Sequence, residues 1–298
     1  MKYYQENDKV ILKNFDSFNI EETFECGQCF RFEKKADGEY VIIAFSKVLT
    51  IKQTEDYIEF YPTDILEFEN IWIKYFDLNR DYTKIKNTLS QKDEVLKKAI
   101  TFAEGIRILQ QDPWECLISF IISQNNRIPM IKQVIKNISE KYGTYVSENF
   151  LFPTFEQIQN ATEDELISCK TGFRAKYILD AINHIKNGNI DFEMLKQADF
   201  QKAKAKLMEI KGVGDKVSDC VLLFSLNKKS AFPIDVWVKR VMEYFYFDGE
   251  NANIKDIHKL AIEKFGDYAG FAQQYLFHYA RQLKIGEKQG SKNENKSK

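Results

Sequence analysis

Short runs of β-prone residues, separated by polar segments, make up the beginning of the chain. They lie at residues 10–12, 30–32, 40–45, 48–51 and 57–61. The segment Ala36-Asp37-Gly38-Glu39 stands between two of these runs and is a typical hairpin turn signal. The first third of the chain is therefore expected to form an antiparallel sheet.

From about Asp64 onward the apolar residues recur at the three- and four-residue steps of helices, as at Leu117, Phe120 and Ile121. Helices are expected at 174–187, 200–209, 216–226, 236–246, 254–265 and 269–284. Prolines stand where helices would begin, at Pro113, Pro129, Pro153 and Pro233. The pattern predicts an α+β protein, in which an antiparallel β-rich N-terminal domain (1–100, with its connecting helices) precedes an all-α body (101–285). Residues 286–298 contain no apolar side chain and are expected to be a disordered tail.

Composition narrows the class of protein. The chain has 298 residues, of which 44% are hydrophobic, as expected for a packed globular protein. The net charge of −1 gives no general attraction to nucleic acid, so any DNA-binding surface requires segregated basic residues. The N-terminus has no apolar targeting segment, and no run approaches ~20 apolar residues. A membrane partner is not expected.

The cysteine count is odd and the spacing scattered, which favours a reducing cytoplasm over a disulfide framework. Cys26 and Cys29 form a C-x-x-C pair, but no second pair completes a tetrahedral zinc site. The three histidines show no ligand spacing, and no carboxylate cluster accompanies them. No metal or cofactor is expected, and a metal-dependent nuclease is the least favoured class.

The most informative segment runs from Leu207 to Val217 and contains a Gly212-Val213-Gly214 turn after Lys211. Two glycines allow a tight turn and a close approach of the backbone to another surface. Free N–H groups at the start of the next helix are suited to bind a phosphate. The segment is interpreted as a DNA-binding helix-hairpin-helix, with a plain corner between two helices as the alternative.

Lys216 and Asp235 lie nineteen residues apart, each beside an expected helix start. The positive helix N-terminus disfavours a protonated ammonium, and a neutral lysine is a nucleophile. Asp235 precedes Val236-Trp237 and is expected to cap that helix. A capping carboxylate is held rigidly, so it is also able to stabilise a developing cation or manage protons. Taken singly, the two residues are also typical of a surface lysine and an ordinary cap.

Together, G-V-G-x-K-V at 212–217 and P-x-D-V at 233–236 resemble the helix-hairpin-helix glycosylases, most closely the 8-oxoguanine DNA glycosylase family. Further segments resemble that family in the same order along residues ~10–285. They are Cys26-Gly27-Gln28-Cys29-Phe30-Arg31-Phe32, Gln111-Asp112-Pro113-Trp114-Glu115-Cys116, Ser123-Gln124-Asn125-Asn126 and Phe271-Ala272-Gln273-Gln274-Tyr275-Leu276-Phe277.

The resemblance implies excision of 8-oxoguanine, flipped out of duplex DNA, by a bifunctional glycosylase and abasic-site lyase. Lys216 would attack the sugar and form a Schiff base, with assistance from Asp235. By the same resemblance, the damaged base would meet the Gly27 carbonyl, Gln273 and Phe277, the last two on one helix face. Cys220, one turn beyond Lys216, is expected on the same pocket wall.

On the DNA side, Asn125 would fill the gap left by the base, Phe173 would act as an aromatic wedge, and Arg174 would contact the orphaned cytosine. Two positions depart from the family pattern. Met130 replaces an arginine that animal and fungal members direct at the cytosine, which predicts a relaxed opposite-base preference. Trp237 replaces a histidine that contacts a phosphate in relatives, and its role is left open.

Three alternatives remain beside this hypothesis. A monofunctional alkylated-base glycosylase would lack Lys216, and an endonuclease-III-like enzyme would carry cysteines after Cys220 for an iron–sulfur cluster. The third is a non-catalytic helix-hairpin-helix DNA-binding protein. The expected partner is duplex DNA containing 8-oxoguanine, bound by a monomer in the cytoplasm of a prokaryote.

Overall fold

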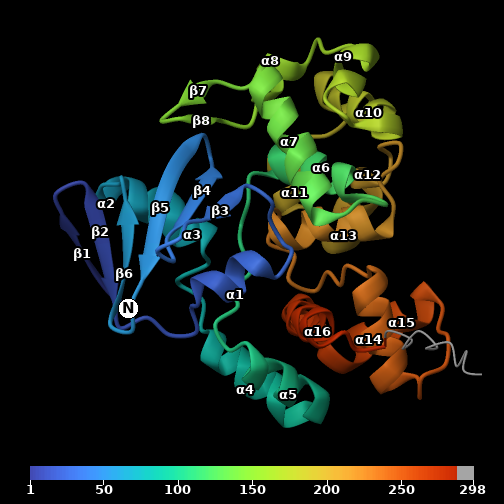
Figure 1. The fold of residues 1–298 in the computed structure, drawn as a ribbon. Coiled ribbons are helices and arrows are strands. Elements are labelled where there is room, and N and C mark those ends of the chain that lie inside the picture. Colours follow the sequence, from blue (N-terminus) through green and yellow to red (C-terminus); the bar gives the residue numbers. More distant parts are fainter. Residues whose placement is uncertain (287–298) are drawn as a thin grey trace, which may run out of the picture.

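The computed structural model describes residues 1–286, and its N-terminal part is built on an antiparallel sheet (Figure 1). The strands lie in the order β1-β2-β6-β5-β4-β3, each antiparallel to its neighbours. Their bounds are β1 Lys2–Glu6, β2 Lys9–Lys13, β3 Phe32–Lys34, β4 Tyr40–Ala44, β5 Lys47–Gln53 and β6 Tyr57–Tyr61; a separate hairpin contains β7 Tyr145–Val146 and β8 Asn149–Phe150.

The alternation of apolar and polar residues explains this sheet. In β4 the buried residues Tyr40, Ile42 and Ala44 alternate with half-buried ones, so one face of the strand enters the core. The predicted turn before β4 is confirmed, with Lys35 N–H donating to the Glu39 carbonyl at 2.8 Å. Two expectations need correction. β1 was not predicted, and the strand expected at 30–32 begins only at Phe32, because Phe30 turns into the helical core.

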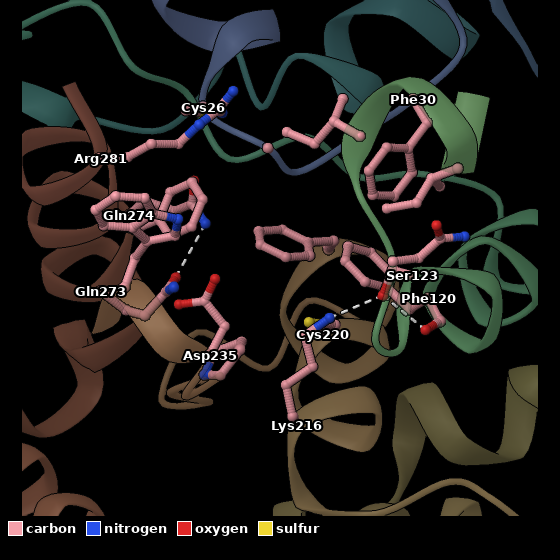
Figure 2. Close-up of a pocket in the computed structure, with 18 of the residues that line it drawn as sticks. Cys26, Phe30, Phe120, Ser123, Lys216, Cys220, Asp235, Gln273, Gln274 and Arg281 are labelled. Atoms are coloured by element: carbon pink, nitrogen blue, oxygen red, sulfur yellow. Dashed lines mark hydrogen bonds between the residues drawn. The ribbon is translucent and has the colours of Figure 1, made fainter. Parts of the chain in front are cut away.

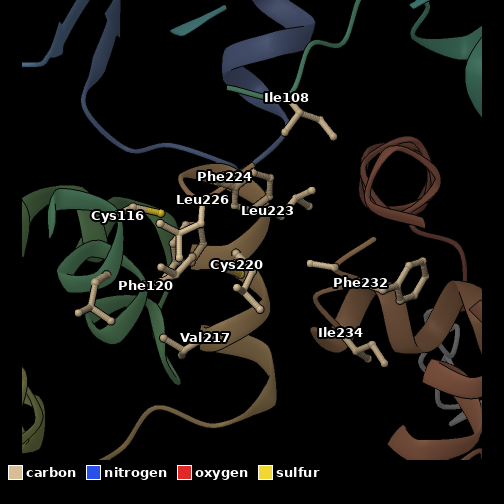
Figure 3. Packing of buried hydrophobic residues seen from close by; sticks show 14 of the residues in the cluster. Ile108, Cys116, Phe120, Val217, Cys220, Leu223, Phe224, Leu226, Phe232 and Ile234 are labelled. Carbon is tan, nitrogen blue, oxygen red and sulfur yellow. The ribbon is translucent and has the colours of Figure 1, made fainter. Parts of the chain in front are cut away.

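The sheet and the helical body have separate hydrophobic clusters. One face of the sheet packs on short helices through Phe24, Phe68, Trp72 and Phe76. The second cluster fills the helical body, and in Figure 3 helix α13 faces α6 there. The rings of Phe120 and Phe224 stack across this contact, with 5.5 Å between their centroids. The site described below lies where this packed helix pair meets the rest of the body.

The helical segments occupy most of the chain after β6, and Figure 1 shows α14, α15 and α16 grouped apart from α6 to α13. Their bounds are α1 Ile20–Glu25, α2 Ile65–Glu67, η1 Phe68–Trp72, α3 Ile73–Tyr75, α4 Tyr82–Lys92, α5 Glu94–Phe102, α6 Pro113–Ser123, α7 Ile128–Tyr142, α8 Phe155–Ile158, α9 Glu163–Ser168, η2 Gly172–Arg174, α10 Ala175–Lys186, α11 Phe192–Gln197, α12 Phe200–Leu207, α13 Asp215–Phe224, α14 Val236–Tyr246, α15 Ile254–Phe265, η3 Gly266–Tyr268 and α16 Ala269–Leu283.

The six helices predicted from periodicity are confirmed within two residues at each end. Pro113 and Pro129 lie in the first turns of α6 and α7, as expected. Pro153 and Pro233 do not start helices, because Thr154 and Asp235 cap the helices that follow them. The α+β fold class is confirmed. The domain boundary near residue 100 stays a prediction, since α4 and α5 contribute side chains to the core of the helical body.

Three expectations concern features outside the fold itself. Apart from Gly286, the tail predicted at 286–298 lies outside the described residues. Within residues 1–286, no helix is long and apolar enough to cross a membrane. In the same part of the chain, no three His, Cys, Asp or Glu side chains gather as metal ligands, and all five cysteines are free and buried.

Candidate active site

A cavity of about 310 Å³ lies between the α6–α13 pair and helix α16 (Figure 2). Segments far apart in the sequence contribute to it, from the turn after α1 to the C-terminal helix. Its lining residues are Cys26, Gly27, Phe30, Phe120, Ser123, Asn126, Arg127, Ile128, Ile131, Lys216, Cys220, Phe224, Pro233, Asp235, Trp237, Gln273, Gln274, Phe277 and Arg281. The predicted nucleophile, carboxylate and base-pocket residues therefore converge on one cavity.

Lys216 is the second residue of α13, directly after the hairpin turn. Its Nζ donates to Ser123 Oγ at 2.9 Å and lies 4.9 Å from the centroid of the Phe120 ring. Ser123 donates its own hydroxyl to the Phe120 carbonyl at 2.8 Å, so the oxygen is left to accept from the lysine. Figure 2 shows both bonds at the end of α6. The amine is thus held at one wall of the cavity and has to leave Ser123 to reach a substrate.

Asp235 is the N-cap of α14, as predicted, and its Oδ1 accepts from Val238 N–H at 2.8 Å. Burial raises the pKa of this carboxyl, against the opposing effects of the cap bond and of nearby Lys216. The cap fixes the carboxylate in position, and the raised pKa reflects the small amount of water around it. A poorly hydrated, fixed carboxylate is suited to stabilise a positive charge that develops in the cavity.

Gly27 lies in the turn after α1 at φ +76°, a conformation that favours glycine. A Cβ at this position would also lie 2.9 Å from Cε1 of Phe277, so the ring packs directly on the backbone. The neighbouring Gln28 is fully buried and donates to the carbonyls of Thr23 and Arg107 at 2.8 and 2.7 Å. This network fixes the turn, and with it the Gly27 carbonyl.

Cys220 lines the cavity one turn after Lys216. Burial raises the pKa of its thiol to about 12, although Lys216 opposes the shift. The thiol is therefore protonated at neutral pH and is suited to pack against a ligand rather than to attack one.

Gln273 and Phe277, which the sequence assigned to the base pocket, share one face of α16 and both line the cavity. Arg281, one further step of four along this face, also lines it and donates to the Glu25 carbonyl at 3.1 Å. Sequence reasoning missed Arg281, although the i, i+4, i+8 spacing could have identified it. It also missed Ser123 as the partner of Lys216, and Gln274, for which periodicity offered no signal.

The hairpin turn packs on α10. A Cβ at Gly212, which has φ +83°, would overlap the ring of Tyr177, so the turn requires glycine there. Lys211 is exposed, and its backbone N–H donates to Asp180 Oδ2 at 2.7 Å. Val213 is buried and anchors the turn, whereas Gly214 is exposed at the N-cap of α13. Only backbone groups and Lys211 are therefore available here to a ligand outside.

The residues predicted to face the opposite strand lie outside the cavity. Met130 and Phe173 are 47% and 53% exposed, and Asn125 is exposed at φ +47°. Arg174 is buried, with its guanidinium bonded to the carbonyls of Gln124, Asn125 and Thr171. In this structure, Arg174 therefore stabilises the loop that contains Asn125.

Trp237 lies in the first turn of α14 and lines the cavity. Its ring lies 5.1 Å from the Arg240 guanidinium carbon, a cation–π distance. The Arg240 guanidinium therefore packs against the indole of Trp237 at the cavity wall.

A helix-hairpin-helix turn beside a cavity with an amine and a half-buried carboxylate defines the class, a DNA-binding protein equipped for nucleophilic chemistry. The model of the 8-oxoguanine DNA glycosylase N-terminal domain matches residues 10–117, and that of the HhH-GPD superfamily of base excision DNA repair proteins matches residues 118–266. The chain therefore belongs to the 8-oxoguanine DNA glycosylase family, within that superfamily.

Individual relatives agree with this assignment. The chain is 31% identical over 239 residues to a probable N-glycosylase/DNA lyase of Methanothermobacter thermautotrophicus (72% of this chain, 74% of the relative). It resembles the crystal structure of Clostridium acetobutylicum 8-oxoguanine glycosylase/lyase with double-stranded DNA containing cytosine opposite 8-oxoguanine. That likeness has a TM-score of 0.93 at 44% identity, covering 96% of this chain and 99% of the other.

A 3-methyladenine DNA glycosylase from Archaeoglobus fulgidus shares the fold at 21% identity, with a TM-score of 0.76 and coverage of 92% and 98% of the two chains. At this identity the likeness extends to the fold alone. The comparisons therefore favour the glycosylase/lyase branch over the alkylated-base branch, in agreement with the presence of Lys216.

Proposed function

We propose that this chain removes 8-oxoguanine from duplex DNA and then nicks the strand, with Lys216 as the nucleophile. The observation that carries the proposal is the convergence of the Lys216 amine and the half-buried Asp235 carboxylate in one cavity beside a helix-hairpin-helix turn. Membership in the glycosylase family, and the names of the relatives, support the substrate class.

In the proposed reaction Lys216 Nζ attacks C1′ of the flipped nucleotide while the bond from C1′ to the base breaks. The departing base takes up a proton. The C1′–O4′ bond then breaks as a proton passes from the amine to O4′, which leaves a Schiff base between Lys216 and the opened sugar. Loss of a proton from C2′ then expels the 3′ phosphate by β-elimination, which nicks the strand. Asp235 stabilises the positive charge on the sugar in the first step, from a fixed position and with little competing water.

The base itself would occupy the cavity between Cys220 and Phe277. Here the fixed Gly27 carbonyl would accept the N7–H of 8-oxoguanine, whereas guanine offers a lone pair at N7 and would be repelled. Gln273 would bind the Watson–Crick edge. The glycine at φ +76° supports this role, because a side chain at this position would displace Phe277.

Outside the cavity, Asn125 would fill the gap left by the base and Phe173 would act as a wedge, since both are exposed and Asn125 directly precedes Asn126 of the cavity lining. Arg174 would recognise the orphaned cytosine, although its guanidinium bonds to loop carbonyls in the free protein. With Met130 in place of a second arginine, we expect a relaxed preference for the base opposite the lesion.

DNA phosphates would bind at the hairpin of Lys211, Gly212, Val213 and Gly214, where the Lys211 side chain and Gly214 are exposed and Val213 anchors the turn. Trp237 would lie near the lesion at the cavity. We further propose a monomer in the cytoplasm of a prokaryote. The free, buried cysteines support a reducing compartment, and the likeness to a Clostridium protein supports the prokaryotic origin.

Borohydride trapping on duplex DNA with 8-oxoguanine opposite cytosine tests the mechanism. Wild-type protein is expected to form a covalent adduct, and Lys216→Gln is expected to form none while retaining DNA binding in a gel-shift assay. Lys176→Gln, at an exposed lysine of α10, is the matched control and should be trapped like the wild type. The absence of a wild-type adduct, or an undiminished adduct with Lys216→Gln, would refute the proposal.

A further inference from the structure

Arg281 is a cationic side chain at the wall of the cavity that the proposed mechanism does not use. It follows Phe277 by four positions on α16, and Figure 2 shows its side chain extending along the wall toward Cys26. Its Nη1 donates to the carbonyl of Glu25, the last residue of α1, at 3.1 Å. In the described part of the chain, no carboxylate forms an ion pair with this guanidinium. The bond to the end of α1 is therefore the polar contact that fixes its position.

The Glu25 carbonyl needs a partner because α1 ends there. The last carbonyls of a helix have no partner within the helix, and a basic side chain is one way to bind them. The last turn of α1 has no basic residue of its own, so an arginine 256 positions along the chain takes this role. Within residues 1–286, this is the only hydrogen bond that joins α16 to α1 or to the turn after it.

Gly27 follows Glu25 by two residues and packs on the same face of α16. A Cβ on Gly27 would lie 2.9 Å from Phe277 Cε1 and 3.9 Å from Arg281 Nη1. The hydrogen bonds of Gln28 fix the shape of the turn, but none of them reaches α16. The position of the turn relative to α16 is therefore set by the packing of Phe277 and by the bond from Arg281.

We infer that Arg281 is a positioning residue for recognition of the damaged base, acting through the Gly27 carbonyl. In the proposed function this carbonyl accepts from N7–H, while Gln273 and Phe277 of α16 bind the edge and the face of the same base. A hydrogen bond weakens steeply when its angle or length departs from the optimum, so the turn and α16 have to keep their relative position. Arg281 bonds one to the other. This inference rests on the proposed function, because it assigns a role at the same base pocket.

Equilibrium binding separates this role from a general attraction to DNA. Two duplexes are compared that differ only in 8-oxoguanine or guanine opposite cytosine, and the Lys216→Gln background prevents cleavage. Arg281→Met, an unbranched apolar replacement, is then added to that background. The preference for the 8-oxoguanine duplex, as the ratio of the two dissociation constants, is expected to fall about tenfold. Loss of a phosphate contact would weaken both complexes equally and cancels in this ratio.

Single-turnover kinetics with an intact Lys216 give an independent readout. An abasic site has no base, so its nicking requires the amine but not the Gly27 carbonyl. Arg281→Met should therefore slow excision of 8-oxoguanine about tenfold and nick a preformed abasic site at the wild-type rate. Gln282→Met, at the next and exposed position of α16, is the matched control and should leave both rates unchanged.

Two results would overturn the inference while leaving the proposed function intact. One is an unchanged ratio of the dissociation constants after Arg281→Met, which indicates that the Gly27 carbonyl keeps its place without the arginine. The other is an equal loss of excision and of abasic-site nicking, which indicates general support of the cavity. A Lys216→Gln protein that binds both duplexes equally contradicts selective recognition of 8-oxoguanine, and with it both the proposed function and the inference.

Discussion

The base cavity and the surface that would meet the opposite strand differ in how firmly their side chains are held. In the cavity, Cys220, Gln273 and Gln274 are each less than 5% exposed, and Lys216 has a hydrogen-bond partner. On the opposite-strand side, Met130 and Phe173 are about half exposed. The cavity side chains are enclosed by the protein in the absence of DNA, whereas those on the opposite-strand side are open to solvent.

This difference separates two kinds of discrimination. In the proposed function, recognition of the damaged base would depend on fixed polar groups, because a buried group left unpaired carries a large cost. Recognition of the opposite base would depend on exposed residues and on Arg174, whose guanidinium binds the loop carbonyls in the free protein. Substitutions in the cavity should therefore change rates strongly, and substitutions outside it should change preference moderately.

Asp235→Asn should give the largest effect on the cavity side. Loss of the negative charge is expected to slow single-turnover excision by roughly 10²–10⁴-fold. Asparagine caps helices about as well as aspartate, so the melting temperature should stay near the wild-type value. Asp235→Ala is the control that removes charge and cap together, and it should also lower the melting temperature. If Asp235→Asn unfolds, the main role of Asp235 is to cap α14, and its proposed catalytic charge is contradicted.

The same residue predicts a pH dependence. Because burial raises the pKa of Asp235, the wild-type rate should begin to fall with acidification at a higher pH than for an exposed aspartate. The residual rate of Asp235→Asn should lack this acidic limb. An identical acidic limb in both proteins would assign it to another group.

Met130→Arg tests the opposite-strand side. A guanidinium there would supply charge-assisted hydrogen bonds to cytosine, so the excision ratio for lesions opposite cytosine over adenine should rise about tenfold. The measurement is excision opposite C, A, G and T. Met130→Leu, which keeps an apolar side chain, should leave the ratio unchanged. A strong cytosine preference already present in the wild type would contradict the expected relaxation.

The sequence contained enough local information to place most of the architecture. Periodicity located α14 to its exact ends, because its apolar stripe is long and Asp235 supplies the cap. The short strand β1 and the helix α1 were not predicted from the sequence, because five or six residues of mixed polarity carry little periodic signal. The proposed catalytic pair, Lys216 and Asp235, was predicted from spacing and resemblance, not from any property of either residue alone.

Contacts between distant segments were beyond sequence reasoning. Ser123 lies 93 positions from Lys216, and nothing in its neighbourhood indicates that its hydroxyl accepts from that amine. Arg174 was expected to face DNA, and its bonds to the Asn125 loop depend on how η2 packs under that loop. In both cases the partner of a polar group is set by tertiary packing.

Helix α6 ends at Ser123 of the cavity lining, two residues before Asn125, and its first turn carries Glu115 close to Arg31. Near its start, the Glu115 carboxylate lies 3.9 Å from Arg31 Nη1, too far for a hydrogen bond. Burial raises the pKa of Glu115 from 4.5 to about 7, against the attraction of Arg31. The folded protein therefore holds a proton on Glu115 over a pH range in which the unfolded chain has lost it.

Glu115→Gln should consequently make stability less dependent on pH. Between pH 4.5 and about 7 the folded wild type binds one more proton here than the unfolded chain, so its free energy of unfolding falls as pH rises. Urea unfolding at about pH 5 and pH 8 should show a loss roughly 1–3 kcal/mol larger in the wild type than in the variant. The opposite-base ratio should not change, because Glu115 lies at the end of α6 remote from the loop. Equal pH dependence in both proteins would mean that Glu115 is ionised in the folded state at pH 5.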